Sequence, residues 1–475
     1  MALPTGWEMV VGMEVHTELL TKSKLFCGCA NHFGSEPNTN VCPVCLGLPG
    51  SLPVLNEEAV ELAMRIGMAL HCTIAPSTFH RKNYFYPDQS KDYQISQYDL
   101  PINANGYLDL PGGTRISIER AHMEEDTGKS THLGGSGRLA GADRSLVDYN
   151  RCGVPLVEIV SGPDIRSAEE ARDYAAELRG ILIATGASDG RLEEGSMRFD
   201  ANVSVRRTGE PFGTRCEIKN LNSLRSLQRA IDYEALRQIE LIEEGGTVRQ
   251  ETRHWDEVLG ETSTLRVKED AEDYRYFREP DLVDLAPDQA WQDRVRAALP
   301  PMPAERRNAL TQRLTNPTDA QKDGIEVVID LGLDVLVNAA IDQSVDPALA
   351  VARAANELAA NLDGLANITA ETFSATLLME QNGELSATQA KTVLGELLEN
   401  GGEPKAIAAA KGFEQLSSDS LGATVADLIE KNPDEWNRYR EGDEKLAQFF
   451  IGQVMKLTQG KANGKAVIAE LQARR

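Results

Sequence analysis

The segment from Gly12 to Glu18 reads Gly-Met-Glu-Val-His-Thr-Glu and alternates strictly between two kinds of side chain. Successive side chains of an extended strand point to opposite faces of a sheet. The ionisable groups of this segment therefore share one face: Glu14, His16 and Glu18. A solvated face of an antiparallel strand is the ordinary alternative. The segment predicts a strand that carries either metal-ligand groups or a wet surface.

A second strand is predicted around Ile116 and Ile118, which alternate with polar residues. If its pleat continues unbroken, Glu125 lies on the polar face with the acidic set and Glu124 lies on the opposite face. A shift of one residue in the register would reverse this assignment.

Two more segments have an apolar back and a polar front. From residue 198 to 206 the polar positions alternate with Phe, Ala and Val, and from residue 216 to 219 they alternate with Cys and Ile. The polar positions that matter most are Asp200, Asn202, Ser204, Glu217 and Lys219. Carboxylate, amide and imidazole groups gathered from four segments suit a hard divalent cation such as Mg²⁺. This pattern favours a metal–nucleotide site for phosphoryl transfer over four separate wet surfaces.

Four cysteines form two close pairs, Cys27-Gly28-Cys29 and Cys42-Pro43-Val44-Cys45. Two pairs of thiols joined by a short loop are typical of a tetrahedral structural zinc site. A loop of reduced cysteines is the alternative.

The stretch Arg81-Lys82-Asn83-Tyr84-Phe85-Tyr86-Pro87-Asp88 combines cations with aromatic rings. Such a stretch can form a platform for a nucleotide base or a tRNA end. Packed aromatic residues with solvated cations explain the composition equally well.

The 475-residue chain is too long for one core and predicts two or three domains. It has neither a signal-peptide pattern nor an apolar run long enough for a membrane span, so a cytoplasmic protein without membrane contact is expected. A net charge of −24 argues against a large phosphate-binding surface, although a local one stays open.

Beyond about residue 293 the strand signals fade, and Ala- and Leu-rich runs such as 347–365 and 387–398 predict helices. Asn400-Gly401-Gly402 predicts a helix end. The domains expected are a catalytic domain over 1–292 with the cysteine loop at 27–45, a helical domain over 293–405 and a tail domain over 406–475. The fold class expected is α+β.

Several of these motifs together resemble the GatB family, the B subunits of aspartyl/glutamyl-tRNA(Asn/Gln) amidotransferases. The resemblance covers the whole chain. The residues that carry it are Gly12–His16, Arg81–Asp88, His122–Asp126, Val147–Pro163, Glu217–Ser223 and Asp273–Asp281.

The resemblance implies a cradle-shaped N-terminal domain with an antiparallel sheet, similar to the glutamine-synthetase type, that holds ATP and Mg²⁺. It implies phosphorylation of the side-chain carboxylate of Asp-tRNA(Asn) or Glu-tRNA(Gln) and displacement of the phosphate by ammonia. An amidase, the A subunit of the complex, would release the ammonia from glutamine, and a small C subunit would complete a heterotrimer. The zinc cysteines occur in only part of the family.

Carried over residue by residue, the family roles assign Mg²⁺ and the phosphorylation site to Glu14, His16, Glu125 and Glu217. Glu124, Asp200, Asn202 and Ser204 are assigned to the ATP cofactor. Lys82 and Lys219 are expected either to neutralise phosphate or to line the ammonia path. The resemblance gives the tail a role in tRNA recognition, and the locally basic C-terminus predicts phosphate contacts through Lys456, Lys461 and Lys465.

Two rival functions remain at this point. A zinc-containing tRNA-binding adaptor without chemistry would need the cysteines and the tail but not the acidic strand faces. A free-standing ligase of the glutamine-synthetase type would need the acidic faces but not the tail.

Overall fold

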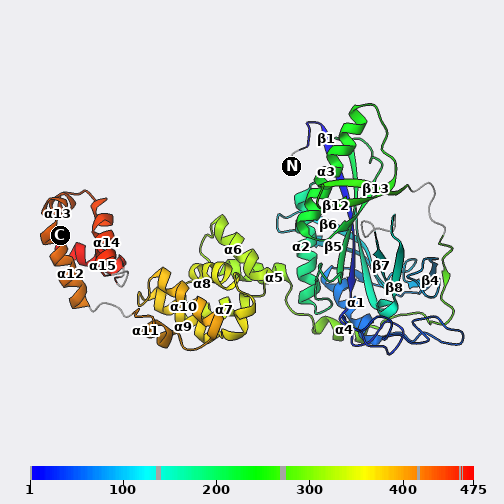
Figure 1. Cartoon of the computed structure of the whole chain (residues 1–475), viewed down its shortest axis with the longest axis horizontal. Helices are drawn as coiled ribbons and strands as arrows, with labels where there is room; N and C mark the ends of the chain where they lie inside the picture. The colour runs from blue at the N-terminus through cyan, green and yellow to red at the C-terminus, as the bar shows by residue number, and fades with distance from the viewer. Residues whose placement is uncertain (1–2, 135–140, 268–273, 414–417, 459–461, 463) are drawn as a thin grey trace. The chain divides into compact units, whose positions relative to one another are not determined.

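The computed structural model describes residues 3–134, 141–267, 274–413, 418–458, 462 and 464–475. The chain divides into two compact units, Met1–Met302 and Pro303–Arg475 (Figure 1). The first unit contains strands and helices, whereas all described elements of the second are helical. This confirms the mixed α+β class.

A large, mostly antiparallel sheet forms the centre of the first unit. Along its main path the strand order is β13-β12-β11-β10-β1-β9-β6-β4-β3-β14, and β2 and β5 extend it beside β6. Strands β7 and β8 form a separate hairpin. The bounds are β1 Trp7–Glu18, β2 Thr73–Ile74, β3 His80–Asn83, β4 Tyr93–Ser96, β5 Asn103–Asp109, β6 Arg115–Glu125, β7 Lys129–Leu133, β8 Arg144–Asp148, β9 Pro155–Ser161, β10 Met197–Arg207, β11 Cys216–Leu221, β12 Glu251–Asp256, β13 Glu261–Val267 and β14 Phe277–Arg278.

Strand β1 confirms the prediction drawn from Gly12 to Glu18. It pairs antiparallel with β10 on one side and with β9 on the other, so His16 lies opposite Arg198 in β10 and Glu158 in β9. Its odd-numbered apolar residues, Met13 and Val15, are fully buried in the core. Because burial of this face fixes the register, the even-numbered polar side chains of β1 all face the other way.

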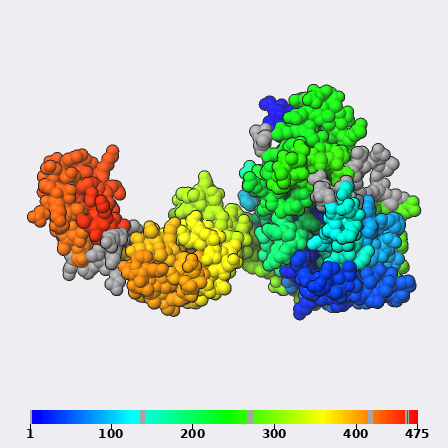
Figure 2. Space-filling model, viewed as in Figure 1, coloured from blue at the N-terminus to red at the C-terminus, as the bar shows by residue number. Residues whose placement is uncertain are grey.

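Three helices cover the apolar face of the sheet: α1 Glu57–Ala69, α2 Ala168–Ala184 and α3 Leu224–Glu243 (Figure 1). Helix α2 begins after Ser167, whose hydroxyl accepts a hydrogen bond from the Glu170 N–H at 3.0 Å. The Glu170 carboxylate accepts from the N–H of Arg166 at 2.7 Å, one residue earlier than a capping box requires. The short helix α4 Gln289–Ala297 and the 3₁₀ turn Tyr149–Arg151 complete the described helices of this unit. In Figure 2 most of the blue N-terminal segments lie along the lower edge of the unit, below segments in cyan and green, and a smaller blue group lies at its upper edge.

A register irregularity in β6 lies between Ile118 and Arg120, where the strand pairs with β9. Before it, Ile116 and Ile118 point into the core, and after it Ala121 and Met123 do so. One extra residue therefore reverses the face of the sheet to which each later side chain points, as in a β-bulge. The predicted unbroken pleat over 115–125 is wrong for this reason.

The second unit contains two separate hydrophobic cores, one from Leu310 to Ala408 and one from Leu421 to Leu471. The predicted helix over 387–398 is confirmed and ends at Gly401, whose φ is 67°. The run 347–365 is not one helix, because a π-helical turn at Ala354–Leu358 and a 3₁₀ turn at Asp363–Asn367 follow α8. The helices are α5 Pro303–Gln312, α6 Asp319–Asp330, α7 Asp334–Asp342, α8 Pro347–Arg353, α9 Ala370–Gln381, α10 Ala387–Asn400, α11 Pro404–Ala410, α12 Ser418–Lys431, α13 Pro433–Arg440, α14 Leu446–Leu457 and α15 Gly464–Arg474.

The predicted domain boundaries after residues 292 and 405 stay predictions. Within the described ranges, no helix is long and apolar enough to cross a membrane.

Helix α1 approaches the sheet closely at Gly67, where an added Cβ would lie 1.9 Å from Oδ1 of Asn103 in β5. The Asn103 amide is buried and donates to the carbonyls of Ala63 and Ala121 at 3.0 Å each. Gly67→Ala would break this bridge, so we expect it to destabilise the first unit by about 1–3 kcal/mol. Gly395→Ala in α10 is the control, because its Cβ meets nothing within 4 Å and the change should stabilise the helix by up to about 1 kcal/mol. Calorimetric melting of the full chain checks both, and equal effects would contradict the close packing at Gly67.

Candidate active site

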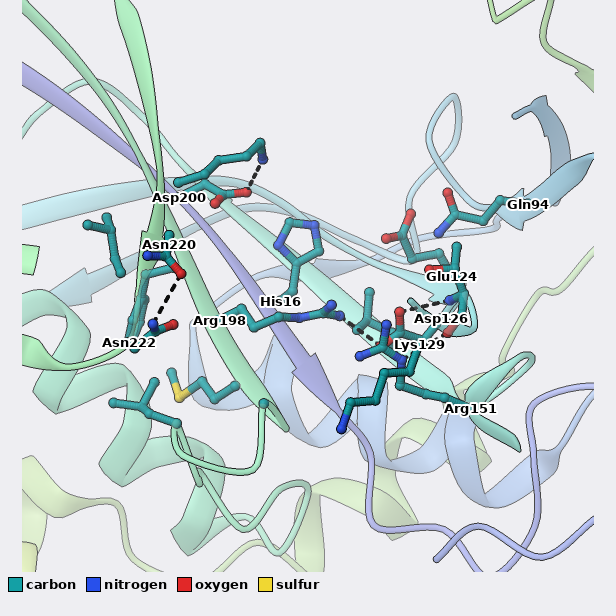
Figure 3. Close-up of a pocket in the computed structure, with 18 of the residues that line it drawn as sticks. His16, Gln94, Glu124, Asp126, Lys129, Arg151, Arg198, Asp200, Asn220 and Asn222 are labelled. Carbon is teal, nitrogen blue, oxygen red and sulfur yellow. Dashed lines mark hydrogen bonds and ion pairs between the residues drawn. The ribbon is translucent and has the colours of Figure 1, made fainter. Parts of the chain in front are cut away.

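The polar face of the sheet borders an open cavity of about 1010 Å³. Strands β1, β6, β10 and β11 each contribute side chains to its wall, and residues of β3 and the segment before β10 close its sides. In Figure 3 the His16 ring lies between Asp200 on one side and Glu124 on the other. Five of the site residues predicted from the sequence line the cavity: His16, Lys82, Glu124, Asp200 and Lys219.

One group of possible metal ligands consists of His16, Glu124 and Glu158, whose ligand atoms all lie within 4.8 Å of one another. His16 Nε2 is 3.7 Å from a Glu158 oxygen, and His122 Nε2 is 3.8 Å from a Glu124 oxygen and 3.6 Å from the same Glu158 oxygen. These separations are too long for good hydrogen bonds. The ligand atoms are therefore close to one another without direct bonds between them, which suits a cation placed among them.

The structure reverses the prediction for the adjacent glutamates of β6. Because of the bulge after Ile118, Glu124 joins His16, whereas Glu125 points away. Glu125 forms an ion pair with Lys91 at 2.5 Å and accepts a hydrogen bond from the N–H of Ile95 at 2.9 Å. Glu125 is therefore not placed to bind the same cation as Glu14 or His16.

A second group of possible metal ligands joins Glu14, Asp200 and Glu217 from three neighbouring strands. Asn202 donates a hydrogen bond to Glu14 at 2.9 Å, and the Thr252 hydroxyl donates to Glu217 at 2.9 Å. The ammonium of Lys219 lies 2.5 Å from Asp200 and 2.8 Å from Glu217. Lys219 thus supplies one positive charge against three carboxylates.

The pKa values of several groups on this face are shifted, in opposite directions, by burial and by neighbouring charges. Burial, together with the charges of Glu158 and Glu217, raises the pKa of Glu14. Burial alone would also raise the pKa of Glu124, but the neighbouring His122 ring and the charge of Lys82 lower it to about 2. Burial would lower the pKa of Lys219, but Asp200 and Glu217 raise it well above its usual range. The site therefore contains excess carboxylate charge that a divalent cation can neutralise.

Two further predicted residues have clear positions. Lys82 lies with its ammonium 4.7 Å from the centre of the Tyr274 ring and faces the cavity. Ser204 is buried, its hydroxyl lies 3.5 Å from the Val10 carbonyl, and it is not part of the cavity wall. The prediction of Ser204 as a cofactor contact is therefore not supported, because the part of β10 that lines the cavity ends at Asp200.

Several wall residues were missed in the sequence. Arg198 donates to Asp126 at 2.8 Å, Arg151 lies 3.6 Å from the same carboxylate, and all three line the cavity. Burial and the Asp126 charge raise the pKa of the neighbouring Glu18 to about 8. Glu158 could have been found, since it is a single charge inside the apolar run 154–160.

The residues of the polar–aromatic stretch 81–88 have different surroundings: some pack within the fold and others line the cavity. Arg81 packs on the Tyr93 ring and forms two hydrogen bonds with Glu279, at 2.6 and 2.9 Å, which tie β3 to the segment after β14. Tyr84 and Tyr86 line the cavity, and their ring centres lie 4.7 Å apart. Arg81 thus connects two segments of the first unit, and both tyrosines face the cavity.

Asn220 is the penultimate residue of β11, has a φ of 71° and lines the cavity. Its side chain donates to the Trp255 carbonyl at 3.0 Å. Asparagine tolerates this left-handed conformation better than other non-glycine residues, and such strained positions cluster at functional sites.

The four loop cysteines gather with all Sγ atoms within 4.8 Å of one another. Cys42 Sγ and Cys45 Sγ are 3.8 Å apart, and the Cys42 N–H donates to Cys45 Sγ at 3.0 Å. A tetrahedron with Zn–S bonds of about 2.3 Å has S–S edges of roughly 3.8 Å, so the donor set fits zinc. A hydrogen bond from Cys27 lowers the pKa of the Cys45 thiol, which favours a thiolate there.

Of the predicted tRNA contacts, Lys456 lies exposed in the last turn of α14. Lys461 and the side chain of Lys465 lie outside the part of the chain that the structure describes.

Comparison with known proteins shows the family of this chain. Residues 9–293 match the model of the GatB/GatE catalytic domain, and residues 336–474 match that of the GatB domain. Three similar relatives are each named as the B subunit of an aspartyl/glutamyl-tRNA(Asn/Gln) amidotransferase. The protein of Mycobacterium sp. (strain KMS) is 49% identical, with 97% of this chain and 95% of the relative covered. Those of Caldanaerobacter subterraneus and Brevibacillus brevis are 48% and 47% identical, with 96% of this chain and 97% and 96% of the relatives covered. The chain therefore belongs to the GatB/GatE family, as its sequence motifs predict.

Proposed function

We propose that this chain is the subunit of a glutamine-dependent amidotransferase that converts the side-chain carboxylate of Asp-tRNA(Asn), Glu-tRNA(Gln) or both into an amide at the expense of ATP. The observation that supports this most strongly is the pair of acidic groups on one sheet face, His16–Glu124–Glu158 and Glu14–Asp200–Glu217. Membership in the GatB/GatE family supports the same reaction.

The sheet would serve as the cradle of a catalytic domain similar to the glutamine-synthetase type. Its antiparallel order, with helices packed on the apolar face and a cavity on the polar face, supports this proposal. A helical domain and a tail domain would follow it.

Each acidic group fits a magnesium ion in the chemistry of its donors. Carboxylate oxygens dominate both, and the open cavity in front leaves room for waters and phosphate oxygens, which Mg²⁺ retains as ligands. Bound magnesium would offset the repulsion between a phosphate group of ATP and the carboxylate to be activated.

The cations of the cavity wall have a separate task. Lys82, Arg198 and Arg151 come from three segments and supply fixed positive charge beside the acidic groups. The carboxylate that attacks ATP is already ionised near neutral pH, so activation needs positioning and charge neutralisation more than a base. His16 therefore serves this proposal as a ligand, and Lys219, already paired with Asp200 and Glu217, holds the second group together.

Zinc at Cys27, Cys29, Cys42 and Cys45 would have a structural role. Four sulfur ligands fill a tetrahedral shell and leave no position for a substrate. The site would fix a loop that has little regular secondary structure between β1 and α1.

The remaining partners follow from the naming of the relatives as B subunits. We propose that an amidase, the A subunit of the complex, supplies ammonia. A small C subunit would complete a heterotrimer that acts in the cytoplasm. We propose the tail domain for tRNA recognition, because it has its own hydrophobic core and ends in basic residues.

A non-catalytic tRNA-binding adaptor is less consistent with the structure. Such a protein has no need of three carboxylates gathered against one lysine on a partly buried face. Each buried carboxylate without a positive partner costs free energy, and function is the usual reason to retain it.

Glu124→Gln removes one ligand charge while keeping the shape of the side chain. We expect ATP-dependent amidation by the reconstituted complex to fall at least about 100-fold, with tRNA binding and glutamine hydrolysis retained. Steady-state amidation and glutaminase assays on both misacylated tRNAs measure this.

The matched control is Glu119→Gln in the same strand, because Glu119 is exposed at the bulge and is not part of the cavity wall. It should keep full activity. Normal amidation by the Glu124→Gln complex would contradict the catalytic proposal and favour the adaptor.

Deletion of residues 406–475 tests the role of the tail. The deletion removes Ala408 and most of α11 from the core formed by Leu310 to Ala408, but it leaves the other residues of that core, which is separate from the tail core. We expect tRNA affinity to fall at least about tenfold, since phosphate contacts carry much of such binding, while glutamine hydrolysis is unchanged. Filter binding at fixed salt measures the affinity, and an unaltered value would overturn the role of the tail.

A further inference from the structure

Lys24 is a buried lysine that has no acidic partner among the residues that the structure describes. It is 0% exposed, and its ammonium donates a hydrogen bond to the Asn40 carbonyl at 3.0 Å. Among the described residues, no carboxylate oxygen lies within 4.0 Å of this ammonium. An ammonium removed from water without a counter-charge costs several kcal/mol. Its burial therefore calls for a negative group close by.

The nearby carboxylate is already engaged. A Cβ at Gly153 would lie 3.8 Å from Lys24 Cδ and 3.9 Å from a Glu125 oxygen, so the two side chains border the same glycine. Glu125, however, pairs with Lys91 at 2.5 Å and with the Ile95 N–H. Glu125 is thus paired with Lys91, whereas the Lys24 ammonium contacts the Asn40 carbonyl.

The cysteine loop surrounds Lys24. The Lys24 N–H donates to the carbonyl of Cys29 at 3.0 Å, in the first cysteine pair. Lys24 Cδ and Cys45 Cβ both border Gly153, at 3.8 and 3.6 Å from the point that a Cβ there would occupy. The Lys24 side chain ends at Asn40, two residues before Cys42. Lys24 is thus anchored to both halves of the loop.

We propose that Lys24 is the buried counter-charge of a tetrathiolate zinc site formed by Cys27, Cys29, Cys42 and Cys45. This inference rests on the zinc site proposed above. Four thiolates around Zn²⁺ carry a net charge of −2, and Lys24 offsets half of it without acting as a ligand. The burial of the lysine and the gathering of four thiols then explain each other.

Zinc binding and the positive charge of Lys24 should therefore stabilise each other. Zinc binding should be weaker without Lys24, because the −2 centre would be buried with no cation beside it. Without zinc the cysteine cluster carries less negative charge than the −2 of the tetrathiolate centre. Loss of the Lys24 charge should therefore cost less stability in the zinc-free protein than in the zinc-bound protein. If Lys24 only filled space, its replacement would cost the same stability with and without zinc.

Lys24→Met keeps the length of the side chain and removes the charge. Lys22→Met, two residues earlier and exposed, is the matched control. Lys24→Arg keeps the charge. The experiment measures zinc content by mass spectrometry, zinc affinity by competition with a chromogenic chelator, and melting with and without zinc, all on the full chain co-purified with its partner subunits.

We expect about one zinc per wild-type chain, an affinity loss of at least about tenfold for Lys24→Met, and little change for Lys22→Met and Lys24→Arg. We also expect zinc to raise the melting temperature less in Lys24→Met than in the wild type. If Lys24→Met is not recovered folded, Lys24→Arg decides: wild-type zinc affinity supports the proposal, and loss of affinity contradicts it.

The two proposals fail in different ways. A wild-type chain that binds no zinc overturns the zinc site and the role of Lys24 together. Zinc bound by the wild type with equal affinity in Lys24→Met overturns the role of Lys24 alone.

Discussion

Strand β1 is held between β9 and β10, and the acidic face of the sheet follows from this pairing. Met13 and Val15 are buried beneath the helices, so β1 cannot shift by one residue without exposing its core face. This fixes Glu14 and His16 on the polar face. The registers with β9 and β10 then bring Glu158 and Asp200 beside them. The hydrophobic effect on one face of the sheet thus positions the charges on the other.

The carboxylates on this face outnumber the cations that pair with them, and this excess of negative charge determines which ligands the face can bind. Lys219 neutralises part of the Glu14–Asp200–Glu217 group, and His122 and Lys82 hold the Glu124 carboxylate ionised. The remaining negative charge lies next to Lys82, Arg151 and Arg198 at the same cavity. A site of this kind can bring cations and anionic substrates together, which is the difficulty of phosphoryl transfer to a carboxylate.

Much of this face could be predicted from the alternation of polar and apolar residues along the strands. Strands β1, β10 and β11 were found in the sequence with the correct polar faces, because burial of alternate Val, Ile and Ala residues leaves a plain pattern. The bulge in β6 could not be predicted, since one extra residue changes no composition yet reverses every later side chain. Glu125 was therefore predicted to lie beside His16, where Glu124 lies instead.

Contacts between distant segments left weaker signals in the sequence. Arg198 and Arg151 were missed as partners of Asp126, because residues far apart in sequence meet only through the sheet order. The cysteine spacing predicted its cluster, since close pairs of one residue type need no knowledge of the fold. The burial of Lys24 had no such signal, because a lysine near a strand end is ordinarily solvated.

Occupation of two cation sites on one sheet face would distinguish a catalyst of phosphoryl transfer from a protein that only binds tRNA. Crystals of the full complex grown with Mn²⁺ and a non-hydrolysable ATP analogue would locate these sites by anomalous scattering. We predict manganese peaks among His16, Glu124 and Glu158 and among Glu14, Asp200 and Glu217, with the nucleotide phosphates in the adjoining cavity. Manganese and nucleotide bound elsewhere, with both acidic groups free of metal, would refute the assignment.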